Sequence, residues 1–411
     1  MSTPQENLVM TDPTGEVFIS YNHNQKDLVV ELDQRLREHG VPVWRDERKT
    51  DPDPLESQIE SVLRSDEIAG AILVVSEDIL NSPTILNVEI PRIYSRQNAG
   101  DEFFAFVLRC PGLSASETNE ILSIAGTVND FSEWFFHALK TREEETPNYT
   151  RIIDEVTQKR LNTIVNSNAD VSSICGSVNS YESPKPTDES WFRADFSHHF
   201  EDSLPSENTW NCRIRETLRR LTNHLGTYAE NKTLEFTGQT RLPIAFTIGC
   251  QFPTTRGIHA TWTQQDPNFN KITWDVTSPS RDVELNVDSK LKDSSKTDLA
   301  VFLSLTDDVR PEVGNTTSDL PNFNTEIEIK RPDYEHGITP EQGVRIAETF
   351  RKTVRDELNS RSNIETIHLF QSSPVGLSFL LGQHTNTLPP IQTYAFNDNH
   401  QPRRYEPAIL M

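Results

Sequence analysis

The 411-residue sequence contains few cysteines, no surplus of basic residues and no long apolar run. The four cysteines stand singly, without the Cys-x-x-Cys spacing of zinc sites and redox motifs. They are Cys110, Cys175, Cys212 and Cys250. No segment approaches the roughly 18 apolar residues of a membrane-spanning helix, and the polar N-terminal stretch lacks the pattern of a signal peptide. We therefore expect a cytoplasmic protein with reduced thiols and no membrane association.

Positive charge is scarce as well. Against 39 Lys and Arg residues stand 62 Asp and Glu residues, which gives a formal net charge of −23 at pH 7. Binding to DNA needs a basic surface and is therefore not expected, although a local basic pocket could hold a small charged ligand. The Walker A and Gly-x-Gly-x-x-Gly motifs are missing, which argues against an ATPase or a dehydrogenase. His198–His199 has no second ligand pair at metal-binding spacing, so we expect neither a metal nor a cofactor.

The first half alternates short apolar strands with amphipathic helices. The pattern predicts strands at 16–21, 41–47, 69–76 and 102–108, with helices at 26–40 and 55–68. Strands that are apolar on both sides predict a parallel sheet covered by helices on both faces, hence an α/β fold. Ligands of such sheets bind beyond the carboxyl ends of the strands. The polar and aromatic residues expected at these ends are Ser20, Tyr21, Trp44, Arg45, Asp46 and Ser76.

One carboxylate, Glu89, stands in the apolar stretch SPTILNVEIPRI, which begins at Ser82. In a helix, Glu89 would lie one turn after Leu86 and one turn before Ile93, at the edge of the apolar stripe. Such a position is costly for a charge that nothing uses. The Ser-Pro pair at its start could cap a helix, which Pro91 would kink unless the helix begins later. From spacing alone, Glu89 is either a solvated surface residue or a functional carboxylate.

The rest of the chain divides by composition. We expect a helical stretch over 133–165 and then, at 166–190, a segment rich in Ser, Asn, Asp and Pro that is typical of a linker. The second half again mixes strands (257–264, 297–306, 366–370) with helices (213–225, 343–361, 377–385). Two strand-then-loop units, at 300–309 and 367–376, favour an internal duplication of α/β units.

Four boxes follow one another in the first half: VFISYNHNQKD, LREHGVPVWRDE, ILVVSEDILNSPTILNVEI and FSEWFFHAL. By these boxes, residues 16 to about 140 resemble a TIR domain. The resemblance implies a flavodoxin-like parallel sheet. Because many such TIR domains hydrolyse NAD+ at the nicotinamide–ribose bond, it also implies that Glu89 is the catalytic carboxylate. The six strand-end residues named above then become candidate contacts of NAD+, which is the substrate and not a cofactor.

The chemistry gives Glu89 a reason for its position. Breaking an N-glycosidic bond builds positive charge on the ribose, and a fixed carboxylate stabilises that charge or orients the ribose hydroxyls. The alternative is a non-catalytic assembly module, in which the loop at residues 45–54 would join one copy to another. In enzymatic relatives that loop is thought to complete the site of a neighbouring copy, so the two roles are compatible.

Residues 191–411 resemble a SAVED domain, the sensor module of anti-phage signalling. The resemblance lies in ADFSHHFEDSLPSENTWN, FTGQTRLPIAFTIGCQFP, LAVFLSLTDDV and IHLFQSSPVGLSFLLGQHTNTLPPIQTYAF. It implies two fused Rossmann-like (CARF-like) units that bind a cyclic oligonucleotide, for which we expect a cyclic trinucleotide.

Phosphate chemistry then selects candidate ligand contacts in this half. A Pro/Gly turn before a helix presents backbone N–H groups to phosphates, an arginine supplies a cation, and Trp262 could stack on a base, although burial is the commoner fate of tryptophan. The full set is Arg241, Gly249, Gln251, Phe252, Trp262, Thr306, Asp307, Ser372, Ser373 and Gly376.

The sequence thus predicts a TIR domain at 1–145, a helical connector and linker at 146–190, and a SAVED domain at 191–411. The expected function is a cyclic-oligonucleotide-activated NAD+ hydrolase of anti-phage defence (CBASS), which self-associates into an oligomer or filament. Two rivals stay open. One is an adaptor that assembles on the cyclic nucleotide without chemistry, and the other is a constitutive nucleotidase that needs no cyclic ligand.

Overall fold

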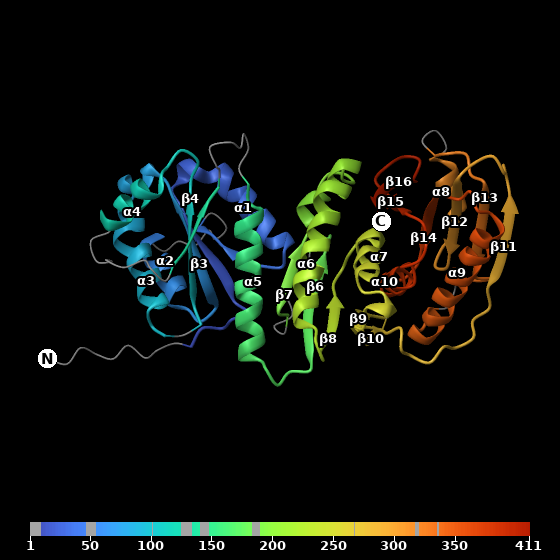
Figure 1. The fold of residues 1–411 in the computed structure, drawn as a ribbon, viewed down its shortest axis with the longest axis horizontal. Helices are drawn as coiled ribbons and strands as arrows, with labels where there is room; N and C mark the ends of the chain where they lie inside the picture. The colour runs from blue at the N-terminus through green and yellow to red at the C-terminus, as the bar shows by residue number, and fades with distance from the viewer. Residues whose placement is uncertain are drawn as a thin grey trace. The chain divides into compact units, whose positions relative to one another are not determined.

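The structure, a computed structural model, describes residues 10–46, 55–100, 102–124, 134–139, 148–182, 190–266, 268–316, 320–334 and 337–411 (Figure 1). The chain forms two compact units. The first comprises residues 1–170 and 190–194, and the second comprises 171–189 and 195–411. Within the described ranges, no helix combines the length and the apolar character that crossing a bilayer requires.

The first unit is built on a five-stranded parallel sheet in the order β2-β1-β3-β4-β5. Its strands are β1 (Glu16–Ser20), β2 (Val43–Trp44), β3 (Ile68–Val75), β4 (Phe104–Arg109) and β5 (Phe135–Ala138). Its helices are α1 (Lys26–Glu38), α2 (Leu55–Arg64), α3 (Ile90–Gln97), α4 (Ala115–Ile124) and α5 (Thr150–Ser167). The strand order is that of a flavodoxin-like sheet, so the predicted fold class is confirmed.

Helices cover both faces of this sheet (Figure 1). α1 and α5 share one buried cluster with Val17 and Phe106, while α2, α3 and α4 share the other with Phe18 and Val107. Every residue of β3 is buried, which explains its unbroken apolar sequence. The carboxyl ends of β1, β2 and β3 therefore meet at one edge of a fully covered sheet, where side chains from separate strands come together.

One predicted helical stretch in this unit is wrong in its first part, while its second part is confirmed by α5. Residues 135–138 lie in the helical stretch expected over 133–165, but they form β5, which pairs with Phe106–Arg109 of β4. The ring of Phe135 stacks on that of Phe106 with 4.8 Å between centroids. The apolar and aromatic stretch at 134–139 is too short to carry a period that separates strand from helix.

A second correction concerns the polar segment 166–190. The composition predicts a linker there, but residues 173–179 form β6, which runs parallel to β8 in the second unit. Ile174, Gly176 and Val178 alternate with more exposed positions, so the strand buries one face despite its Ser and Asn content.

The second unit contains two further sheets. In the first, β6 (Ser173–Asn179), β8 (Thr233–Thr237), β9 (Ala260–Gln265) and β10 (Lys271–Trp274) lie in the order β10-β9-β8-β6. The second has the order β11-β13-β12-β14-β15-β16. Its strands are β11 (Asn286–Leu291), β12 (Asp298–Ser304), β13 (Thr325–Lys330), β14 (Thr366–Ser372), β15 (Ile391–Asn397) and β16 (Arg404–Leu410). Strand β7 (Phe192–Asp195) spans the boundary of the two units.

The helices of the second unit are α6 (Arg215–Tyr228), α7 (Leu242–Gln251), α8 (Arg310–Gly314), α9 (Pro340–Ser360) and α10 (Val375–Gln383). α7 packs against α10 and against β15 and β16, while α10 also packs against β9 and β10. The two helices thus lie between the sheets, and nearly all their residues are buried, as their apolar sequences require.

Two glycines allow α7 and α10 to pack this closely. A Cβ at Gly249 would lie 2.1 Å from the Phe379 carbonyl oxygen, and one at Gly382 would lie 2.2 Å from that of Phe246. This packing by itself accounts for a glycine at position 249, where the sequence suggested an approach for a ligand.

Gly249→Ala is expected to lower the free energy of unfolding by about 1–3 kcal/mol, because the new methyl group must displace backbone atoms of α10. Gly314→Ala is the matched control, since no atom lies within 4 Å of the Cβ it would add. Urea unfolding followed by circular dichroism measures both. An unchanged midpoint for Gly249→Ala would contradict the close packing of the two helices.

Candidate functional sites of the two units

Glu89 closes a π-helical turn, Ile85–Glu89, that leads directly into α3. The N–H of Ile90 bonds to the carbonyl of Ile85, five residues back, and Pro91 follows in the first turn of α3. The segment is therefore helical from 83 to 97, and Pro91 lies inside it. A proline there removes one backbone hydrogen bond to the preceding turn, and that turn is the π turn, where the bonding pattern already departs from that of an α-helix. π turns within α-helices are found frequently at functional sites.

The Glu89 side chain is buried, with only 5% exposed. Burial raises the pKa of its carboxyl to about 7; a hydrogen bond from Ser20 opposes this shift, and the negative charge of Asp46 adds to it. Buried carboxyl groups with pKa values near neutrality occur mainly where a protein uses them. Glu89 is thus a buried group and not the solvated surface residue that its spacing also allowed.

Three residues expected at the site therefore interact: Ser20, Asp46 and Glu89. Within the described part of the chain, neither the Ser20 hydroxyl nor Asp46 Oδ1 has a partner with full hydrogen-bond geometry, although both atoms are buried. The second Asp46 oxygen lies 3.8 Å from Nε2 of His23. Buried acceptors without partners are costly, so this corner of the first unit is prepared for hydrogen-bond donors from outside.

Ser76, which follows β3, belongs to a separate polar network. Its hydroxyl donates to Gln25 Oε1 at 2.9 Å, and Gln25 Nε2 donates to Asp78 Oδ2 at 2.9 Å. Asn22 Nδ2 adds a bond of 3.1 Å to the Asp78 carbonyl. Sequence reasoning missed the partners of Ser76. Their positions just after β1 and β3 are the only signal that could have revealed them.

The other three strand-end residues are held by packing or, for Arg45, by an ion pair within the first unit. Trp44 is 4% exposed and stacks on Phe18, with ring centroids 4.9 Å apart. Arg45 donates from Nε to Oδ2 of the buried Asp33 at 2.9 Å. Tyr21 is buried in the core on the α1 side of the sheet. Of the predicted assembly loop at 45–54, residues 47–54 lie outside the described residues.

In the second unit, hydroxyl groups gather at the carboxyl ends of β12 and β14. Thr306 Oγ1 and Ser372 Oγ lie 2.7 Å apart, and the Ser372 carbonyl accepts from the N–H of Thr306 at 3.1 Å. The hydroxyl of Ser373 is buried and has no hydrogen bond among the described residues. Asp307 is exposed beside them and accepts from the N–H of Asp308 at 2.8 Å. Four predicted residues are thus brought together at one sheet edge.

The N-terminus of α10 is partly occupied by the protein itself. The N–H of Gly376, expected to face a phosphate, donates to Gln264 Oε1 at 2.8 Å. Its Cα also packs on the buried Trp274 ring, which a Cβ would approach to 2.1 Å. A ligand at this helix end would therefore meet the Ser372–Ser373 hydroxyls before the backbone of Gly376.

Arg241 lies at the N-terminus of α7. Its guanidinium donates to the Phe396 carbonyl at 3.2 Å and lies 4.8 Å from the ring centroid of Tyr181 and 5.7 Å from that of Phe200. Asp398 is 3.9 Å away. The Nε–H group is buried and makes no hydrogen bond within the described ranges. Arg241 is therefore a cation between aromatic rings that retains a donor for an anion.

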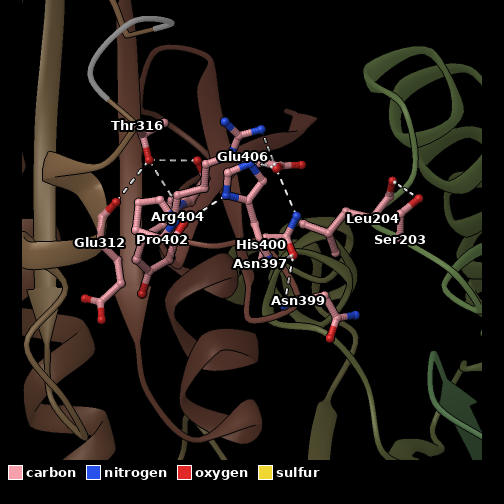
Figure 2. Close-up of polar contacts among 11 residues, drawn as sticks. Ser203, Leu204, Glu312, Thr316, Asn397, Asn399, His400, Pro402, Arg404 and Glu406 are labelled. Atoms are coloured by element: carbon pink, nitrogen blue, oxygen red, sulfur yellow. Dashed lines mark hydrogen bonds and ion pairs between the residues drawn. The ribbon is translucent and has the colours of Figure 1, made fainter.

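The turn beside Arg241 is held by its own side chains, as Figure 2 shows. Asn397 Oδ1 accepts from the N–H groups of Asn399 and His400 at 3.2 and 3.1 Å, and Asn397 Nδ2 donates to Glu406 at 2.9 Å. Arg404 Nε donates to the same Glu406 oxygen at 2.9 Å. These contacts fix the turn that places Asp398 next to Arg241, and no sequence signal pointed to them.

The remaining candidates lie in or beside the core of the second unit. Trp262 and Phe252 are fully buried around Phe236, and Trp262 also approaches Phe379, with 6.0 Å between ring centroids. The carbonyl of Gln251 accepts from Arg256 at 2.6 Å. Packing accounts for the burial of Trp262 and Phe252, whereas the bond of Gln251 involves only its backbone.

Comparison with known proteins gives a family for each part. Residues 17–148 match the family described as TIR domain, and residues 217–411 match SAVED, described as "SMODS-associated and fused to various effectors sensor domain". No curated protein matches the chain.

Similar solved structures include Cap4 SAVED/CARF-domain containing receptors. That of Acinetobacter baumannii with the cyclic trinucleotide 3'3'3'-cAAA has 12% identity, covering 78% of this chain and 84% of the receptor, at a TM-score of 0.48. That of Moraxella osloensis has 13% identity, covering 88% and 86%, at a TM-score of 0.42.

Proposed function

Because the chain carries an N-terminal TIR domain and a C-terminal SAVED sensor domain, we propose that it is a defence effector that hydrolyses NAD+ when a cyclic oligonucleotide binds. The observation that carries the catalytic part is the buried Glu89 carboxyl with its pKa raised to about 7, a pKa that Ser20 and Asp46 also influence. The SAVED domain supplies the sensing part.

In the proposed reaction, the bond between the ribose C1′ and the nicotinamide nitrogen breaks and its electron pair leaves with nicotinamide. Positive charge develops on the ribose, and the Glu89 carboxylate stabilises it at close range in a weakly solvated pocket. Water then adds to C1′ and loses a proton, which completes ADP-ribose. The unpartnered oxygen of Asp46 is suited to accept a hydrogen bond from a ribose hydroxyl.

For the ligand, the second unit offers a cation and hydroxyl groups. Arg241 is suited to a phosphate because its guanidinium is permanently charged and keeps a free Nε–H. The Thr306, Ser372 and Ser373 hydroxyls can donate to phosphate or ribose oxygens. In a chain with a net charge of −23, such a local cation is what lets an anionic ligand bind.

Ligand binding is proposed to act on the TIR domain by joining protomers into an oligomer or filament. Head-to-tail contacts can repeat without closing, so one ligand-bound copy recruits the next. The segment at 45–54 would then meet a neighbouring copy, as the resemblance to enzymatic TIR domains implies.

Arg241→Met is expected to weaken binding of the activating nucleotide about tenfold to a hundredfold, the effect of losing a charge-assisted hydrogen bond. Arg345→Met, at an exposed arginine of α9, is the matched control and should bind as the wild type does. Isothermal titration measures both, and thermal unfolding confirms that each variant is folded. Wild-type affinity in folded Arg241→Met would remove Arg241 from the site.

A ligand panel tests the function as a whole. Purified protein is mixed with NAD+ and with cyclic di-, tri- and tetranucleotides, including 3'3'3'-cAAA, at low and high salt, while NAD+ loss and light scattering are followed together. If the proposed function is right, one class of ligand produces both NAD+ loss and increased light scattering. Scattering without NAD+ loss would favour the adaptor, and NAD+ loss without any ligand would favour the constitutive nucleotidase.

A further inference from the structure

β11 is the outermost strand of the six-stranded sheet in the second unit (Figure 1). Every one of its six residues is exposed, although a strand at a sheet edge ordinarily buries one face. Two of the exposed residues are apolar: Val287 is 44% exposed and Leu291 is 52% exposed. The strand therefore leaves apolar side chains and one edge of its backbone open to water.

The register of the sheet shows which backbone groups are open. Val287 pairs with Ile329 of β13, and Asp288 pairs with Glu328. Beyond the strands, Arg331 donates its N–H to Ser304 of β12, and Lys292 donates its N–H to the Asn324 carbonyl. By the alternation of an antiparallel ladder, even-numbered residues of β11 bond to β13, while the N–H and C=O groups of 287, 289 and 291 point outward.

The sequence of this edge is complementary to itself when read backwards. If two copies of β11 pair antiparallel about Ser289, each Val287 lies opposite a Leu291 and each Asp288 opposite a Lys290. The outward groups of 287, 289 and 291 then form the hydrogen-bonded pairs, as the ladder requires. We propose that β11 is a homodimerisation edge, through which two copies of this chain join their sheets across a twofold axis.

The charges select this arrangement over others. Lysine on an edge strand ordinarily discourages pairing, but here the mirrored position in the partner carries an aspartate. Within its own chain Asp288 lies opposite Glu328, whose carboxylate pairs with Arg310 at 3.7 Å. A lysine from the second copy therefore gives Asp288 a cation of its own. Parallel pairing in register would instead set Lys290 against Lys290 and Asp288 against Asp288.

The contact is small, because five paired residues from each strand bury far less surface than a permanent dimer does. The resulting dimer is therefore weak, concentration-dependent and independent of any nucleotide. It is also isologous, unlike the head-to-tail contacts proposed for ligand-driven assembly, and can link two growing assemblies side by side.

Sedimentation velocity of the full chain, without cyclic nucleotide or NAD+, measures self-association. Variants that reverse the charge at position 288 or 290 test the proposed pairing. Asp288→Lys and Lys290→Asp each turn two attractive pairs into two repulsive ones, and each is expected to weaken self-association about tenfold. A mixture of the two variants restores opposite charges at every pair, so it should associate as the wild type does. The double variant Asp288→Lys/Lys290→Asp should do so by itself.

Ser289→Pro gives an independent arm, because it removes an outward N–H at the centre of the contact without breaking a bond to β13. It is expected to abolish dimerisation while circular dichroism shows the wild-type fold. A wild type that stays monomeric up to its solubility limit would overturn the proposal. So would a dimer that the single charge variants leave intact. Because neither NAD+ nor ligand is present, these outcomes do not depend on the proposed function.

Discussion

Glu89→Gln is expected to abolish ligand-triggered NAD+ cleavage and to leave ligand binding and assembly unchanged. The amide has nearly the shape of the carboxyl group but no negative charge, so it cannot stabilise the charge that develops on the ribose. Losing one such electrostatic contact in a buried site costs about a hundredfold to a thousandfold in rate. Nicotinamide release measures the chemistry, and light scattering in the same cuvette measures assembly.

Glu120→Gln is the matched control, because Glu120 is exposed on α4 and the substitution makes the same chemical change. It should retain full activity. Wild-type turnover by Glu89→Gln would remove Glu89 from the mechanism. Loss of both turnover and assembly would instead show that Glu89 acts by maintaining the fold or the contact between protomers.

Glu89→Gln is also expected to stabilise the folded protein above pH 7, by about 3 kcal/mol relative to the wild type. Folding raises the pKa of the Glu89 carboxyl from its ordinary value of 4.5 to about 7. Between these two values the folded state holds a proton that the unfolded state has lost, so the free energy of unfolding falls as the pH rises. Above about pH 7 the whole cost of burying the charge is present, and glutamine does not incur it.

Urea unfolding at a series of pH values measures this effect. The wild type and Glu89→Gln should have nearly equal stability near pH 4.5 and differ most at pH 8, with the variant the more stable. Glu120→Gln should follow the wild type throughout. Equal stability of wild type and Glu89→Gln at pH 8 would contradict the burial of an ionisable Glu89. A residue that lowers stability where it is charged is expected at a site that function maintains.

Most of the fold could be predicted because strands and helices that are buried in the core have recognisable apolar sequence patterns. β3 is an unbroken apolar run because it lies between two helical layers. The helix predicted at 343–361 is α9, which begins three residues earlier, at Pro340, after a capping box between Thr339 and Gln342. β5 was not predicted because it is short. β6 was not predicted because its three buried residues, which are small or apolar, alternate with mostly polar ones.

The sequence predicted where the candidate sites lie but not in which direction their side chains point. That Ser20, Asp46 and Glu89 come together follows from the meeting of strand ends at one sheet edge. A strand end does not reveal where its side chain points: Trp44 stacks on Phe18 and Arg45 forms an ion pair with Asp33. The partners that surround Gly249 and Arg241 come from distant parts of the chain, which no local pattern encodes.

The most direct test of the central claim follows nicotinamide release by a single preparation before and after the activating cyclic oligonucleotide is added. The account predicts no release beforehand, steady release afterwards, and a return to silence once a nuclease has destroyed the ligand. Release at the same rate before and after addition would contradict it.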